Sequence, residues 1–565
     1  MFKYLFYLKY LRFAFVSTVL IVLITLTIPF EIAVEPGLGK MLYEKIFVTL
    51  DVYLLYKYLG IQTILLGFGC IFTLLFTLHQ TKITISISNA IKEKMLMNLF
   101  HAKMGFYYIY DTGFLIKRIV EDSQAIAVGI SSIITIFCNV LIITCIGTVL
   151  YIIKDWICYV YCVLLAISIL WIPIWLKPIY IYNLKIGELY SNMYSQYWEI
   201  LPGIKEIKTN NLYHSVNKKM CELSKNLKRD NIIITILYAL MHQLSFFFPM
   251  AGYTAFLIIG LVKIENGEFT IGLLLGLFSI LWGIYQPVQT IFGSIDSVQS
   301  GMTAVKRIAV LKNATQEKTG KKRFVEFKDS IEFKSVTFSY NGKNNVVENI
   351  DLAIYKGRKV ALVGTTGSGK STLINLLLNL FDDYSGEISI DGVRLHDYSI
   401  KSLRDKIVLI TQDVHIFKDT IRNNIDMRSQ LTDDEIVDIL LKVNLHELVA
   451  SLPKGIDTKI GEEGVNLSGG EKQRISIARC FAAHPQIVVL DEITSSLDPE
   501  NERRLIAEIE NYAVDKTLIS ISHKLSTIKN YDEIHVIKKG RIVEKGTHDE
   551  LLRKNSEYCS LFNLA

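Results

Sequence analysis

The chain lacks the cysteine patterns that support small secreted folds and metal clusters. It has eight cysteines in 565 residues, but no C-x-x-C pair and no group of possible ligands with the spacing of a metal site. Most of these cysteines lie in or beside apolar stretches, and reduced thiols are the expected state. A disulfide framework is therefore excluded as the basis of the fold.

Charged side chains are also scarce, because Asp, Glu, Lys and Arg make up only 21% of the chain while 50% of its residues are hydrophobic. The mean hydropathy is +0.32, and the apolar content is concentrated before about residue 295. A single soluble core would not need this arrangement. The composition therefore indicates a membrane protein with an apolar first half.

Six apolar stretches in that half are long enough to cross a bilayer, which takes about 20 residues. The candidate spans are residues 12–34, 57–79, 127–153, 156–176, 233–262 and 269–293. A basic segment precedes the first span, as in a signal peptide, but the apolar run is too long and lacks a convincing small-residue cleavage site. We therefore expect this span to be a retained membrane anchor.

Basic residues are concentrated in two of the loops between the spans. Those between the second and third spans are Lys82, Lys92, Lys94, Lys103, Lys117 and Arg118. Nine more lie between the fourth and fifth spans, whereas the alternate loops carry only a few lysines. The positive-inside rule therefore places both long loops and both chain ends in the cytoplasm. The net charge of +6 thus reflects the basic cytoplasmic loops. It does not indicate nucleic-acid binding, which would require a basic face on a soluble domain.

A glycine-rich loop in the second half has the pattern G-x-x-x-x-G-K-[ST] over residues 364–371. In this pattern backbone N–H groups surround phosphate oxygens, Lys370 meets the β and γ phosphates, and the Ser371 hydroxyl reaches Mg²⁺. Residues 358–363 predict a buried strand before the loop, and residues 372–378 predict a helix whose N-terminus faces the phosphates. This context favours a nucleoside triphosphate site over a chance glycine turn.

A second motif, LSGGEKQR at residues 467–474, follows the loop by about a hundred residues. With the loop, it makes this half resemble the nucleotide-binding domain of ATP-binding cassette (ABC) transporters. In that family the signature of one subunit closes over ATP on the P-loop of another, and Ser468, Gly469 and Gly470 match the residues that meet the γ phosphate. A plain serine N-cap is the alternative for this octet alone, but it would not explain the other family segments. Just upstream, Glu463 stands where many exporters carry arginine, so the contacts that couple the domains are expected to differ here.

The resemblance also assigns roles to single residues elsewhere. Asp491 and Glu492 follow an apolar strand at 487–490. The resemblance assigns Asp491 to the Mg²⁺ shell and Glu492 to the role of general base for the attacking water. His523 matches the switch histidine, and Gln412 matches the Q-loop glutamine that senses Mg²⁺ and the water. Tyr340 matches the aromatic residue that stacks on adenine. Without the family match, a lone histidine or tyrosine would more often be structural.

The implied site residues fall into three roles. The catalytic residues are Glu492, His523, Gln412 and Lys370. The nucleotide-binding residues are Tyr340, Gly364, Thr365, Thr366, Gly367, Ser368, Gly369, Lys370, Ser371, Thr372, Ser468, Gly469, Gly470, Glu471 and Asp498. The expected Mg²⁺ ligands, partly through water, are Ser371, Gln412 and Asp491. ATP and Mg²⁺ are the cofactors that this set implies.

The predicted fold is an α-helical six-span transmembrane domain followed by a cytoplasmic α/β P-loop ABC ATPase domain. The expected boundaries are 1–308 for the transmembrane domain, 309–330 for a charged linker and 331–565 for the ATPase. Segments 106–122 and 201–208 resemble the coupling helices of the family, and an amphipathic surface helix is the alternative for each.

The resemblance implies ATP-driven export or flipping of an amphipathic drug, peptide or lipid by alternating access, in the cell inner or plasma membrane. One membrane domain and one ATPase domain make half of such a transporter, so a dimer is expected. A homodimer is favoured because this chain supplies Lys370, Asp491, Glu492, Ser468 and His523, and a heterodimer with a degenerate partner stays open. An importer and an ATP-gated channel or regulator are the alternative functions.

Polar residues inside the spans are the candidates for cargo contact. They are Asn139, His242, Gln243, Gln286 and Gln289. Polar groups in apolar helices rarely face lipid, so these residues either line a pathway or form hydrogen bonds between helices. The spans are poor in charge and contain aromatic residues, which favours an amphipathic or hydrophobic cargo.

Overall fold

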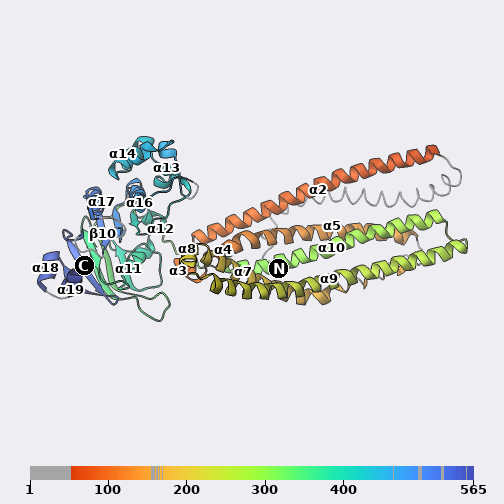
Figure 1. Cartoon of the computed structure of the whole chain (residues 1–565), viewed down its shortest axis with the longest axis horizontal. Helices are drawn as coiled ribbons and strands as arrows, with labels where there is room; N and C mark the ends of the chain where they lie inside the picture. The colour runs from red at the N-terminus through yellow and green to blue at the C-terminus, as the bar shows by residue number, and fades with distance from the viewer. Residues whose placement is uncertain are drawn as a thin grey trace. The chain divides into compact units, whose positions relative to one another are not determined.

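The computed structural model describes residues 52–153, 159–160, 163, 166–167, 170–312, 314–461, 464–493, 499–522, 527–554 and 557–564. By its internal contacts the chain divides into two compact units (Figure 1). The first contains Met1–Ala102 and Phe106–Thr315, and the second contains Lys103–Gly105 and Gln316–Ala565. The predicted span 12–34 and most of the predicted span 156–176 lie outside the described residues.

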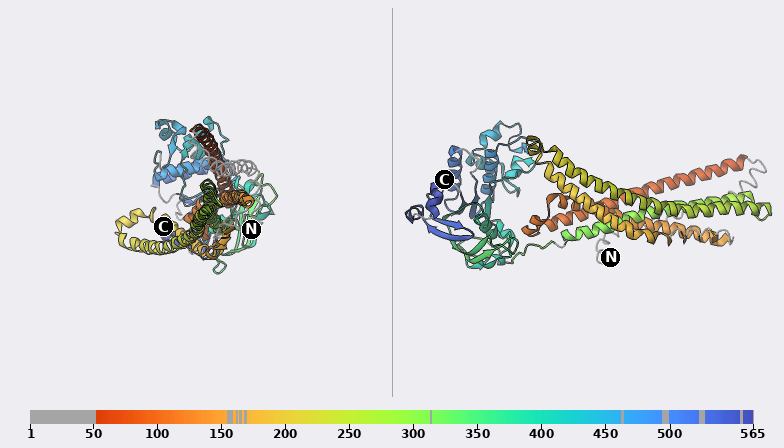
Figure 2. Two further views of the ribbon diagram at one scale, coloured as in Figure 1. Left: turned by 90° about the vertical axis from the view of Figure 1, so that its right-hand side faces the viewer. Right: turned by 60° about the horizontal axis from the view of Figure 1, so that its bottom comes forward.

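The described part of residues 52–312 consists of helices joined by short turns. The helices are α2 (Val52–Phe100), α3 (Met104–Ile109), α4 (Thr112–Lys117), the π-helical η3 (Arg118–Asp122), α5 (Ser123–Ile153), α7 (Ile172–Ile200), α8 (Ile204–Thr209), α9 (Tyr213–Glu265) and α10 (Ile271–Lys312). The α7–α9 pair separates from the other long helices toward its α8 end (Figure 2). The predicted coupling segments correspond to α3, α4 and η3 and to α8.

Three helical stretches in the described part are long and apolar enough to cross a membrane. They are Gly67–Phe100, Thr112–Thr148 and Tyr213–Glu265. The predicted spans 57–79, 127–153, 233–262 and 269–293 lie in α2, α5, α9 and α10, respectively. Helices satisfy every backbone hydrogen bond within the segment, which is why they can cross hydrocarbon. The predicted helical membrane region is confirmed.

Helix α2 changes its surroundings along its length. In its first part Ile64, Phe68 and Ile71 are more than half exposed, as expected for side chains that face lipid. Further on, a stripe of apolar residues four positions apart is buried against α5 and α10. This stripe consists of Ile83, Ile87, Ile91, Met95 and Leu99. A single helix therefore serves both lipid and protein neighbours.

A buried ion group joins η3 to α10. Asp122, with 2% of its side chain exposed, accepts from Arg118 at 2.9 Å and from Arg307 at 2.6 Å. Arg307 also closes against Gly187 of α7, where an added Cβ would lie 2.9 Å from the guanidinium. Two arginines thus neutralise one carboxylate where three helical elements meet.

The second unit contains two main sheets in its described part. Its strands are β1 (Ser330–Phe338), β2 (Val347–Tyr355), β3 (Lys359–Val363), β4 (Ser385–Ile390), β5 (Val393–Arg394), β6 (Ile407–Ile410), β7 (Asp419–Thr420), β8 (Lys459–Ile460), β9 (Ile487–Asp491), β10 (Thr517–Ile521), β11 (Glu533–Lys538) and β12 (Arg541–Gly546). One sheet has the order β12-β11-β3-β10-β9-β6 and is parallel except for β12, and the other is antiparallel with the order β2-β1-β4-β5.

The parallel sheet is buried on both faces. Alternate residues of one strand point to opposite faces, and in β9 Ile487 and Val489 join one apolar core while Val488 and Leu490 join the other. Continuous apolar runs of this kind are typical of parallel strands. In β9, a polar side chain therefore appears only where the strand ends.

Helices cover this sheet and extend from it. They are α11 (Lys370–Leu377), α12 (Ile400–Arg404), α13 (Ile421–Ile425), α14 (Asp433–Lys442), α15 (His446–Ser451), α16 (Gly469–Ala483), α17 (Pro499–Tyr512), α18 (His548–Lys554) and α19 (Glu557–Leu564). Much of the segment expected to be a linker packs on this unit: Phe324 and Phe327 are buried in its core, and Glu317 pairs with Arg404 at 2.8 Å.

We expect Asp122→Asn to destabilise the helical unit, because it leaves the buried Arg118 and Arg307 without a counter-charge. Removing one partner of a buried ion pair costs about 3–5 kcal/mol. Thermal unfolding of the full chain in detergent, followed by circular dichroism, measures the loss. The matched control is Glu121→Gln, which removes the neighbouring exposed charge. Equal melting temperatures for the two variants would contradict the structural role of Asp122.

Candidate nucleotide-binding site

Glycines in the left-handed region of backbone space shape the loop between β3 and α11. Gly367 and Gly369 have φ of +78° and +106°, which residues with side chains rarely adopt. A Cβ at Gly369 would also lie 2.8 Å from the Val346 carbonyl oxygen. Ser368 Oγ is buried and has no hydrogen-bond partner among the residues that the structure describes. The loop therefore has the backbone of a phosphate cradle and an unused hydroxyl inside it, and its residues fit a nucleoside triphosphate.

Lys370 begins α11 and turns back into this loop. Its side chain is buried, and Nζ donates to the carbonyl oxygens of Gly364 at 2.9 Å and Thr365 at 3.0 Å. Burial lowers the pKa of Lys370, while the carboxylates of Glu492 and Asp491 act in the opposite direction. Two neutral carbonyls are weaker partners for an ammonium than phosphate oxygens. The side chain is thus positioned where a phosphate would take over its hydrogen bonds.

The carboxyl end of β9 brings two acids to the loop. Strand alternation puts Asp491 on the same face as Ile487 and Val489, which is the face that α11 covers. Ser371 Oγ donates to Asp491 Oδ1 at 3.4 Å. A hydroxyl and a carboxylate are oxygen ligands of the kind that Mg²⁺ prefers, and this ion usually takes its other ligands from water and phosphate.

Glu492 ends the strand in an unusual backbone conformation. Its φ is +50°, which for a residue other than glycine costs about 1–3 kcal/mol. Its N–H donates to the Ile521 carbonyl oxygen of the neighbouring β10 at 3.2 Å, which helps to hold the turn. Strain of this kind persists where the surrounding structure enforces it, and it often marks a functional residue.

Tyr340 lies in an aromatic cluster beside α11. Its hydroxyl lies 3.1 Å from Thr372 Oγ1, and its ring makes edge contacts with Phe338 and Phe381 at centroid distances of 5.0 and 5.2 Å. The residue is nonetheless 46% exposed. An aromatic ring that is fixed at its edges and open to solvent can stack on a flat base.

The signature segment forms the N-terminus of α16. Ser468 is the N-cap in a capping box, in which Glu471 Oε2 accepts from Ser468 N at 2.6 Å and Ser468 Oγ accepts from Glu471 N at 3.4 Å. The serine cap considered as the alternative is therefore present. It does not exclude the signature role, because a helix N-terminus still directs free N–H groups outward. Nothing lies within 4 Å of a Cβ added to Gly469, so there is room at this end.

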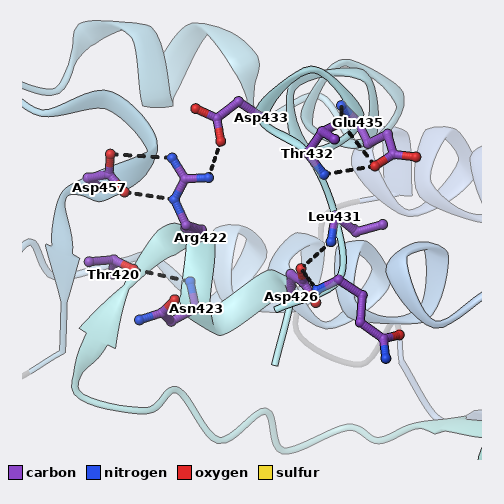
Figure 3. A network of polar contacts seen from close by, with 10 residues as sticks. Thr420, Arg422, Asn423, Asp426, Leu431, Thr432, Asp433, Glu435 and Asp457 are labelled. Carbon is purple, nitrogen blue, oxygen red and sulfur yellow. Dashed lines mark hydrogen bonds and ion pairs between the residues drawn. The ribbon is translucent and has the colours of Figure 1, made fainter. Parts of the chain in front are cut away.

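Polar contacts hold the helices around α16 in place. Arg479 of α16 donates to the Asn424 carbonyl oxygen of α13 at 2.7 Å. In the same region Arg422 binds Asp457 at 2.8 Å and also pairs with Asp433 (Figure 3). Arg422 lowers the pKa of both carboxyl groups. These contacts tie α13, α14 and α16 together and so support the signature.

The remaining expected residues are only partly placed. Gln412 is exposed in the segment after β6, and because β6 and β9 are parallel neighbours, Gln412 and Asp491 follow strands that end at the same edge of the sheet. His523, Asp498 and Glu463 lie outside the described residues. Their assigned roles stay predictions.

Two residues were not singled out by the sequence. Phe381 packs on Tyr340, and an aromatic residue shortly after the P-loop helix was a weak signal for this contact. Asp296 was missed because the predicted sixth span ends at residue 293, whereas α10 continues to Lys312. An acid seven positions after Gln289 could have pointed to a polar helix face.

Known proteins resemble the chain over nearly its full length. Residues 347–495 match the ABC transporter family, and residues 14–288 match the ABC transporter transmembrane region. A relative from Desulfotalea psychrophila, named ATP-dependent lipid A-core flippase, is 31% identical over 552 residues, which are 93% of each chain. A putative multidrug export ATP-binding/permease protein of Bacillus subtilis is 37% identical over 304 residues, covering 53% of this chain and 52% of that protein.

A solved structure supports the fold. It is that of a bacterial Atm1-family ABC exporter with ATP bound, and it matches 98% of this chain and 98% of its own with a TM-score of 0.85 at 22% identity. The family match, the helical membrane region and the P-loop site together lead to one conclusion. The chain belongs to the ABC transporter family, whose ATPase domain couples ATP hydrolysis to transport across a membrane.

Proposed function

We propose that the protein is an exporter or flippase that works as a homodimer and uses ATP with Mg²⁺ to move an amphipathic substrate by alternating access. The observation that carries this proposal is that one chain combines a helical membrane region with a P-loop, a β9 carboxylate pair and a signature helix. The protein lies in the cell inner or plasma membrane. Its basic loops support a cytoplasmic location for the ATPase domain.

Each residue of the site has a chemical task in this proposal. The loop N–H groups and Ser368 Oγ bind phosphate oxygens, and Lys370 offsets their charge. Ser371 and Asp491, with Gln412, would hold Mg²⁺, which would supply charge neutralisation at the phosphates. Glu492 accepts the proton of the attacking water as general base, and Tyr340 stacks on the adenine.

A second copy completes the site. The N-terminus of α16 has room beside Gly469, and the N–H groups of Gly469 and Gly470 are suited to an anion. In a homodimer, Ser468 of each copy closes over the P-loop of the other, which gives two identical sites. Binding of ATP then favours the closed state by its differential affinity, and hydrolysis removes that bias.

The cargo class is supported by the relatives and by the membrane unit. One relative is named for lipid A-core and another for multidrug export, and both names describe amphipathic molecules. The polar residues of the membrane helices, set among apolar side chains, suit a molecule with an apolar body and a polar head.

We expect Glu492→Gln to retain ATP binding but to slow hydrolysis about 100-fold or more, because a positioned general base contributes about 10²–10⁴-fold. Radiolabelled ATP binding and phosphate release by the purified full chain in nanodiscs separate the two effects. Glu510→Gln, on α17 of the same unit, is the control and should hydrolyse ATP at the parent rate. Parental turnover by Glu492→Gln would refute its role as the base.

Reconstitution in vesicles tests the transport direction. With the ATPase domain outside, added ATP should drive an amphipathic cargo from the outer face into the lumen or to the inner leaflet. Movement toward the ATPase side would indicate an importer. Passive ion current that requires ATP but moves no cargo would indicate a channel, and either result would contradict the proposal.

A further inference from the structure

One face of α10 carries polar residues at helical spacing. Gln289, Phe292, Asp296, Gln299 and Thr303 follow one another at intervals of three or four positions, which places them along a single stripe. We call these five residues the α10 stripe. Phe292 and Thr303 have 1% of their surface exposed and Gln299 has 7%, whereas Gln289 and Asp296 are half-buried, so most of the stripe points into the unit.

The stripe faces α7 and α9. Gln299 Nε2 donates to the Leu176 carbonyl oxygen of α7 at 2.5 Å. The ring of Phe292 lies 6.2 Å from that of His242 on α9. Tyr238, one turn before His242, is within electrostatic range of Asp296 and accepts a hydrogen bond from Asn183 of α7 at 3.0 Å.

The stripe leaves polar atoms unpaired. Asp296 Oδ1, Gln289 Nε2 and Gln299 Oε1 are buried and have no hydrogen-bond partner within the described part of the chain. On the facing helix, Trp175 Nε1 is in the same state. Buried polar groups are nearly always hydrogen-bonded, and leaving one unpaired costs about 1–3 kcal/mol. Four such atoms on neighbouring helices therefore favour access of a polar ligand or water to this face.

Asp296 differs from the fully buried Asp122 and Asp230 because it has no basic partner among the described residues. Asp122 binds Arg118 and Arg307, and Asp230 binds Lys185 at 2.8 Å. The next basic residue along α10 is Lys306, about 15 Å farther along the helix at 1.5 Å per residue. Lys306 is engaged by the Tyr180 hydroxyl. A half-buried carboxylate without a counter-ion can be paired by a cation from outside the chain.

We propose that the α10 stripe binds the cationic head of an amphipathic cargo, with Asp296 as its counter-charge and the Gln299 amide oxygen as a hydrogen-bond acceptor. This inference rests on the proposed function and narrows its substrate class. The rings of Phe292, His242 and Tyr238 add aromatic surface, which attracts organic cations. The apolar body of the cargo lies along the membrane-spanning part of the helices, N-terminal to Gln289 on α10.

The test compares two ions of the same shape and opposite charge, tetraphenylphosphonium and tetraphenylborate. Equilibrium binding to the full-length protein in nanodiscs is measured, and the signal of empty nanodiscs is subtracted. We expect Asp296→Asn to weaken tetraphenylphosphonium binding about tenfold or more, the change that about 1.4 kcal/mol produces. Tetraphenylborate binding should not weaken. Asp296→Glu should retain the affinity for the cation.

Glu268→Gln is the matched control, because it removes an acid that is exposed in the turn after α9. It should bind tetraphenylphosphonium as the parent does. Unchanged cation binding in a folded Asp296→Asn variant, or a parent protein that binds only tetraphenylborate, would overturn the inference. Equal loss of binding in Asp296→Glu and Asp296→Asn would also overturn it, since the charge would then not matter.

The same nanodiscs separate this inference from the proposed function. ATP hydrolysis by the parent without any added ion reports on the proposed function alone. If hydrolysis is present but cation binding does not depend on Asp296, only the cargo inference fails. If the parent hydrolyses no ATP, the proposed function fails regardless of which ion binds.

Discussion

Burial of both faces of the parallel sheet is the constraint on which the ATPase unit depends. Ile487 and Val489 fill one core and Val488 and Leu490 fill the other, so β9 has no room for a polar side chain before Asp491. The parallel strands β3, β6, β9 and β10 all end at one edge. The P-loop, Gln412 and the two acids must therefore gather there, because ligands of open α/β sheets bind outside the carboxyl ends of the strands.

The helical unit treats Asp122 and Asp296 in opposite ways. Asp122 is neutralised by Arg118 and Arg307 and joins η3 to α10, so its charge serves the structure. Asp296, on the same long helix as Arg307, is half-buried and has no such partner among the described residues. The ion pairs of Asp122 already join the helices, so an unpaired carboxylate at Asp296 adds no comparable structural contact. The contrast favours a joint at Asp122 and a binding role at Asp296.

Local patterns predicted the parts of the site that depend on nearby sequence. The strand expected at 358–363 is β3 (Lys359–Val363), and the helix expected at 372–378 lies within one or two residues of α11 (Lys370–Leu377). The same patterns could not reveal the left-handed backbone of Glu492, which depends on a hydrogen bond to β10. They also could not reveal the pairing of Arg422 with Asp457, because 35 residues separate the two. Apolar runs placed the spans 57–79, 127–153, 233–262 and 269–293 within helices. They did not show how far these helices continue, so the α10 stripe beyond residue 293 was missed.

The proposed function requires that the P-loop and the signature of one chain act on different ATP molecules. The most direct measurement is occlusion of ATP in dimers assembled from two variants, Lys370→Ala and Ser468→Arg, each carrying its own affinity tag. If each ATP lies between the P-loop of one copy and the signature of the other, both substitutions fall in the same site of the mixed dimer. The second site then has an unchanged P-loop and an unchanged signature. We predict one occluded ATP per mixed dimer and none in either parent homodimer. No occlusion in the mixed dimer would contradict the account, since it would mean that each P-loop depends on the signature of its own chain.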